Sequence, residues 1–122
     1  MSVDWVRRFC LSLAHTTETV QWGSDLVFKV GGKMYAVTAL EPAPVWLSLK
    51  SAPEDFAELT QRQGVIPAPY MARASWIALE NEDALPVAEI KRLLRQSYGL
   101  VLARLPKKTR AALSYRSTGL VE

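Results

Sequence analysis

The sequence contains a single cysteine, a single histidine and no long apolar run. With Cys10 alone, a disulfide within the chain is excluded, which fits a cytoplasmic protein. With His15 alone, a site of several His and Cys ligands is excluded, as are most nucleophile–base pairs. No apolar stretch reaches the length of a membrane helix, and Asp4, Arg7 and Arg8 interrupt any signal segment. We therefore expect a cytoplasmic protein with no membrane partner.

Motifs for catalysis and nucleotide binding are also missing. Residues 31–33, Gly-Gly-Lys, resemble part of a phosphate-binding loop. They lack its earlier glycine and its Ser or Thr after the lysine, and they stand between two strand-like runs. The acidic stretch at residues 80–83 is typical of a polar turn rather than a cation site. These absences predict a non-enzymatic protein without a cofactor or a metal.

The length and composition are those of one globular domain. The 122 residues are 49% hydrophobic and 22% charged, which is ordinary for a domain with its own core. No linker or internal repeat divides the chain. We predict a single domain over residues 1–122, in which residues 114–122 form a frayed tail.

Positive charge is concentrated toward the C-terminus. Residues 1–85 hold seven basic and ten acidic side chains, whereas residues 86–122 hold eight basic and two acidic ones. Such asymmetry favours an anionic partner, although a solvated, slightly basic terminal helix is the simpler interpretation.

Residues 25–50 have the pattern of three antiparallel strands. Gly31-Gly32 suits a two-residue hairpin turn, which needs the positive φ that glycine adopts easily. Three cross-strand pairs follow from this turn: Val30 with Lys33, Phe28 with Tyr35, and Leu26 with Val37. After two prolines, residues 45–50 alternate between apolar and polar side chains, as in a half-buried strand. A fourth strand is predicted over residues 74–80.

This alternation assigns side chains to the two faces of the sheet. The predicted core face carries seven apolar or aromatic side chains: Leu26, Phe28, Tyr35, Leu47, Leu49, Ile77 and Leu79. The opposite face carries two lysines and two tryptophans: Lys29, Lys50, Trp46 and Trp76. The pattern predicts helices over residues 2–13, 51–63, 86–105 and 107–113, with a loop over 65–73. The fold class is therefore α+β, an antiparallel β-sheet with helices packed on one face.

Several short strings resemble the MmcQ/YjbR family. They are V-Q-W-G at 20–23, F-K-V-G-G-K-M-Y at 28–35, L-S-L-K-S-A-P-E at 47–54, Trp76 after a proline-rich loop, and Ser97-Tyr98. The resemblance runs from residue 3 to residue 113. It implies a frataxin-like (CyaY-like) fold and DNA binding through a double-wing arrangement. Residues 70–76 depart from the family pattern, since they lack the polar residues that relatives tend to have there.

The leading hypothesis is weak, largely sequence-independent DNA binding by a basic and aromatic sheet face. Lysine contacts phosphates, and an exposed tryptophan can stack on an unpaired base. The candidate residues are Lys29, Lys33, Trp46, Lys50, Arg73, Trp76, Lys107 and Lys108. Burial of the two tryptophans would leave the same face to a protein partner or a homodimer. A third alternative is a small-molecule pocket between the sheet and residues 65–73.

Overall fold

The computed structural model describes residues 2–113, so the predicted frayed tail lies outside the described residues. The helices are α1 (Ser2–Leu11), α2 (Pro53–Leu59) and α3 (Val87–Ala103), with a 3-10 turn η1 (Ala72–Ala74). Residues 107–113 are helical as well. The strands are β1 (Thr16–Gln21), β2 (Asp25–Val30), β3 (Lys33–Ala39), β4 (Leu47–Lys50), β5 (Val65–Pro67) and β6 (Trp76–Leu79).

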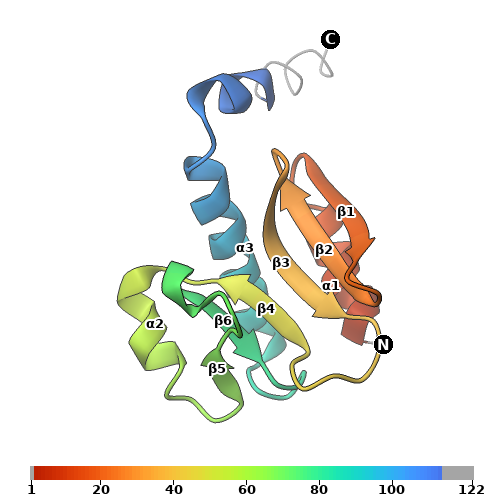
Figure 1. Cartoon of the computed structure of the whole chain (residues 1–122), viewed down its shortest axis with the longest axis vertical. Coiled ribbons are helices and arrows are strands. Elements are labelled where there is room, and N and C mark those ends of the chain that lie inside the picture. Colours follow the sequence, from red (N-terminus) through yellow and green to blue (C-terminus); the bar gives the residue numbers. More distant parts are fainter. Residues whose placement is uncertain (1, 114–122) are drawn as a thin grey trace.

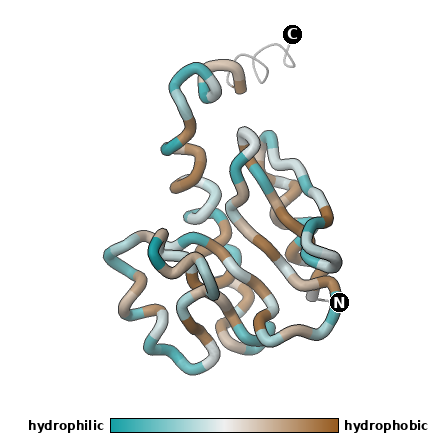
Figure 2. Tube along the Cα trace, in the orientation of Figure 1, coloured by the Kyte–Doolittle hydropathy of each residue, from teal (hydrophilic) through white to brown (hydrophobic). Residues whose placement is uncertain are grey.

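The six strands form one antiparallel sheet in the order β1-β2-β3-β4-β6-β5 (Figure 1). All seven side chains assigned to the core face lie in the main core, which α1, α2 and α3 cover from one side. Hydrophobic residues, brown in Figure 2, recur along the strands that carry this core. The predicted α+β fold is therefore confirmed, with the helices on one face of the sheet.

Two strands in the structure, β1 and β5, are additional to the four strands that the alternation predicted. β1 carries three threonines and only one apolar residue, Val20, so its sequence shows no apolar period. β5 is three residues long and ends at Pro67. Both are edge strands, where a threonine-rich or proline-containing segment can pair on one side only.

The hairpin register was predicted correctly at its turn and incorrectly beyond it. Val30 pairs with Lys33, but Phe28 pairs with Ala36 and Leu26 with Thr38. A β-bulge places one extra residue on β3, so Tyr35 has no partner on β2. The bulge lets Tyr35 and Ala36 both enter the main core, whereas Val37 faces the other side of the sheet.

The side chain of Tyr35 ties three elements together. Its hydroxyl lies 2.9 Å from the Thr16 hydroxyl of β1 and donates to the carbonyl of Cys10 in α1 at 3.3 Å. Its ring packs edge-on against Tyr98 of α3. Because these bonds pair a buried hydroxyl, they hold the N-terminal helix and edge strand against the sheet.

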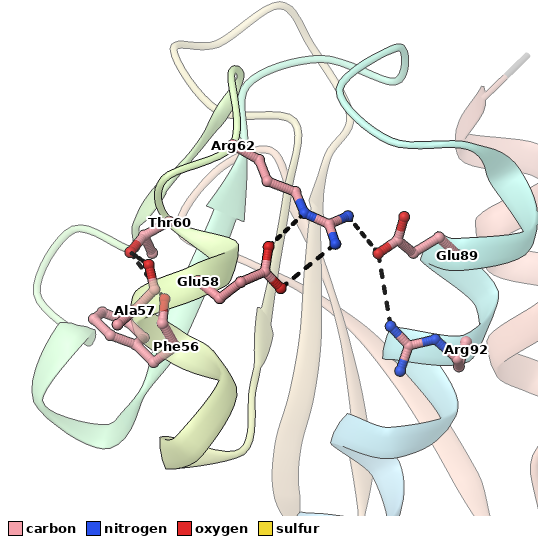
Figure 3. A network of polar contacts seen from close by, with 7 residues as sticks. All are labelled: Phe56, Ala57, Glu58, Thr60, Arg62, Glu89 and Arg92. Atoms are coloured by element: carbon pink, nitrogen blue, oxygen red, sulfur yellow. Dashed lines mark hydrogen bonds and ion pairs between the residues drawn. The ribbon is translucent and has the colours of Figure 1, made fainter.

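A polar network joins the segment after α2 to the start of α3 (Figure 3). The Arg62 guanidinium bonds Glu58 at 2.8 Å and Glu89 at 2.6 Å, and Arg92 lies 3.6 Å from the same Glu89 carboxylate.

α2 ends at Leu59, earlier than predicted, where the Thr60 hydroxyl donates to the carbonyl of Phe56. Among residues 2–113, no helix is long and apolar enough to cross a membrane.

Candidate nucleic-acid interface

Three cations line one hollow at the end of the sheet beside the β2–β3 turn. The hollow measures about 220 Å³ and is bordered by Lys33, Lys50 and Arg104. Met34, Trp76, Val101 and Leu105 complete its wall, so no carboxylate lines it. We call this site the basic hollow.

Lys50 occupies the most enclosed position of the three. It is only 9% exposed, and its Nζ donates to the carbonyl of Ala74 at 2.6 Å. Burial lowers the pKa of the Lys50 ammonium below its ordinary value, and the charge of nearby Arg104 lowers it further. An anion in the basic hollow would therefore relieve repulsion between these two cations.

The chain after α3 brings further positive charge to the same place. Gly31, in the β2–β3 turn, has φ +59°, and a Cβ there would lie 2.5 Å from Leu105 and 3.3 Å from Thr109. The helical residues 107–113 therefore contact the turn through Thr109, and Lys107 and Lys108 are exposed in the same helical segment. Only glycine combines this φ with this approach.

Several cations elsewhere in the molecule have partners that the cations at this end lack. Arg7 bonds Glu18, Arg62 bonds two glutamates, and Arg92 lies against Glu89. Lys91 and Arg95 stand over the rings of Trp5 and Phe9. Within residues 2–113, by contrast, no ion pair involves the cations at this end: Lys33, Lys50, Arg104, Lys107 and Lys108.

The structure separates the two tryptophans assigned to the site. Trp76 does face away from the main core, but it is 5% exposed, because Ala68 and Met71 pack over it. Trp46 precedes β4, where the chain is irregular, and its ring packs against Trp5 of α1 at 6.2 Å. The prediction that the two rings form one exposed stacking surface is therefore wrong.

The remaining candidates are dispersed. Lys29 pairs with Met34 across the hairpin and is partly buried on the face opposite the main core. Arg73 is exposed in η1, on the segment that covers Trp76. Arg104 was not among the candidates, although it lies in the basic segment 86–122 that the charge pattern had indicated.

The lone cysteine and histidine are separated from this site. Cys10 is fully buried in the main core, and His15 follows α1 in a turn with φ +64°. Burial raises the pKa of the Cys10 thiol to about 12. Among the described residues, no three His, Cys, Asp or Glu side chains are grouped to hold a metal.

Cys10 should not react with iodoacetamide at pH 8 while the protein is folded. A buried thiol with a raised pKa supplies almost no accessible thiolate, and the thiolate is the reactive form. The buried, neutral Cys10 thiol contributes to the stability of the fold at pH values below the pKa of this thiol in the unfolded chain. This contribution is lost as pH rises through the pKa of about 12 that the thiol has in the folded protein. Mass spectrometry should show alkylation only after urea is added, and rapid labelling in buffer would contradict the buried placement.

A second hollow lies on the same side of the sheet, between the strands and residues 69–71. It measures about 480 Å³, and most of its wall is apolar. Its position matches the pocket predicted between the sheet and residues 65–73. We call it the apolar hollow.

Comparison with solved structures supports the fold. A crystal structure of Deinococcus radiodurans protein DR2400, which carries domain DUF419, is 35% identical, with a TM-score of 0.82 over 92% of this chain and 87% of that one. A Pseudomonas syringae protein, structural genomics target PsR293, has a TM-score of 0.70 at 23% identity, over 83% and 99% of the chains. The second likeness concerns the fold alone.

Sequence comparison gives the family. No curated protein matches the chain. The YjbR family model matches residues 11–100, which include the sheet and most of α3. The chain therefore belongs to the YjbR family.

Proposed function

We propose that this protein binds DNA without catalysis, through the phosphate backbone and the basic end of the molecule. The observation that carries the proposal is the group of unpaired cations at the basic hollow and in the helical residues after it. When lysine and arginine side chains without internal counter-ions bind DNA phosphates, cations condensed on the DNA are released. This release supplies most of the non-specific affinity. A single phosphate oxygen group can enter a hollow of about 220 Å³ between Lys33 and Arg104.

The same geometry argues against sequence reading. The buried ring of Trp76 cannot stack on a base, so single strands gain no advantage from it. The helical residues beside the turn offer Lys107, Lys108 and Arg110, but no Asn or Gln for base edges. Binding should therefore be weak, similar for all sequences, and without a preference for single strands.

Reversing Lys33 and Arg104 to glutamate should weaken binding of double-stranded DNA at least about tenfold at low salt. Both side chains are exposed, so the domain should stay folded. Lys50 is unsuitable for this test, because a glutamate there would bury an acid. The slope of log affinity against log salt should become shallower by about two, one for each phosphate that is no longer neutralised. Fluorescence anisotropy of a labelled duplex between low and moderate salt measures both quantities.

A matched control reverses Arg8 and Arg92, which lie away from the basic hollow, and changes the net charge equally. This variant should keep most of the affinity. Equal weakening in the two variants would show that total charge, and not this site, governs binding. No binding to any DNA at low salt would reject the proposal and favour a protein partner or a homodimer.

A further inference from the structure

We infer that the apolar hollow is a second binding site, for a small aromatic cation. The site goes beyond the proposed DNA binding, since it is a different hollow with a different lining. Its volume of about 480 Å³ falls in the range of pockets that enclose small organic molecules. Its wall comes from Met34, Val37, Val45 and Met71 among others, so carbon and sulfur face the ligand.

The rim of the apolar hollow carries two aromatic residues that are exposed and have a left-handed backbone. Trp22 and Tyr70 both line the hollow, and their side chains are 64% and 105% exposed. Among the residues that the structure describes, they are also two of the four non-glycine residues with positive φ, at +53° and +66°. A left-handed backbone is unfavourable for a bulky residue, and such strain gathers at ligand-binding positions. Glycine would fit both backbones better, so the rings serve something other than local folding.

Two polar groups indicate which ligand fits. The Asp25 carboxylate lines the hollow and has no hydrogen bond or ion pair with any described residue. Ser48 is 7% exposed, lines the hollow, and its hydroxyl likewise has no partner within residues 2–113. An unpaired carboxylate selects a cation, and the Ser48 hydroxyl on the wall offers one hydrogen bond to a ligand.

The aromatic rim strengthens the same preference. The faces of tryptophan and tyrosine attract a cation within about 6 Å of the ring. In the part of the chain that the structure describes, protein cations stand over Trp5 and Phe9, and none stands over Trp22 or Tyr70. These two ring faces are therefore available to a ligand. An apolar floor, a carboxylate and two free rings together fit a flat aromatic amine.

Three indole compounds test the inference because they share one ring and differ in charge. Tryptamine is a cation, indole is neutral and indole-3-acetate is an anion. We expect tryptamine to bind most tightly and indole-3-acetate most weakly, with shifts in two-dimensional NMR spectra at the Trp22 indole and the Met71 amide. No shift with any of the three compounds at millimolar concentration would overturn the inference, as would shifts elsewhere or equal binding of anion and cation.

Asp25→Asn should lower tryptamine affinity about threefold and leave indole affinity unchanged, because only the charge interaction is removed. Asp83→Asn is the matched control, since Asp83 lies outside the hollow, and it should change neither affinity. Weaker binding of both compounds in Asp25→Asn, or the same weakening in the control, would contradict the assigned role of Asp25.

Tyr70→Gly separates binding from folding. The variant removes a rim ring and relieves the left-handed backbone, so the urea midpoint should rise while tryptamine affinity falls about threefold or more. DNA affinity should not change, since Tyr70 does not line the basic hollow. A lower midpoint would assign the ring to the fold instead. Concentration-dependent self-association that Tyr70→Gly abolishes would assign the hollow to a second copy of the chain.

Discussion

Replacing Phe28 with alanine is expected to lower the free energy of unfolding by about 3–5 kcal/mol. Phe28 is fully buried in β2, within the main core that α1 and α3 cover. Removing the ring forfeits its transfer free energy and leaves a cavity that a packed sheet cannot fill by relaxing. A domain of this size is stable by about 5–15 kcal/mol, so the change is a large fraction of the total.

Urea denaturation followed by far-ultraviolet circular dichroism measures this effect. Val20→Ala is a suitable control, because Val20 lies on the edge strand β1 and is 56% exposed. It should change stability by less than about 0.5 kcal/mol. Phe28→Leu should cost less than Phe28→Ala, since it leaves a smaller cavity. A decrease below about 1 kcal/mol for Phe28→Ala would place Phe28 outside the core.

The sequence predicted the core face of the sheet because alternation is a local property. In β2, β4 and β6 every second side chain enters the main core, as period two requires. Gly31-Gly32 defined the hairpin turn for the same reason, since the requirement for positive φ is local. Alternation failed where the backbone leaves the strand, and Trp46 precedes the first paired residue of β4.

The alternation of the strands does not predict whether a side chain on the opposite face is exposed to solvent. Trp76 is on the face that alternation assigned, yet residues 68–71 pack over its ring. Which loop covers a sheet face depends on contacts between distant segments, and period two carries no information about them. The bulge at Tyr35 was not predicted for a similar reason, because the hydrogen bond to the Tyr35 carbonyl comes from α3, a distant segment of the chain.

The candidate site was predicted in part. The charge pattern indicated the basic C-terminal region, and the structure brings Arg104 and the helical residues 107–113 against the hairpin that carries Lys33. The pattern could not show that Lys50 is enclosed. It also could not show that Trp22, Asp25 and Tyr70 meet around one hollow, because these residues come from separate turns and strands.

The second large effect is expected at Ser97, in the buried middle of α3. Its Oγ accepts the N–H of Lys50 at 2.9 Å and donates to the carbonyl of Tyr35 at 2.6 Å. The β3–β4 ladder ends at Ala36 and Leu49, so the next backbone groups, on Tyr35 and Lys50, do not bond each other directly. The serine hydroxyl stands between them and satisfies both.

Ser97→Ala should therefore destabilise the protein by about 2–5 kcal/mol, because two buried backbone groups are left without a partner at about 1–3 kcal/mol each. The amide of Lys50 should also exchange with deuterium faster than in the parent protein. Ser12→Ala is the matched control, since Ser12 is exposed beyond the end of α1 and bonds only the carbonyl of Phe9. Its effect should stay within about 0.5 kcal/mol.

Ser97→Cys distinguishes the hydrogen bonds from the packing. A thiol fills nearly the same space but is a weak donor and a weak acceptor, so this variant should also be clearly less stable. Full stability of Ser97→Cys would show that volume alone matters at this position. A decrease below about 0.5 kcal/mol in Ser97→Ala would mean that the opening of the β3–β4 ladder does not depend on α3. If Ser97→Ala lowers the stability as expected, the serine that forms part of the family resemblance has a physical role. Its hydroxyl bridges the backbones of β3 and β4 beside the bulge that brings Tyr35 into the core.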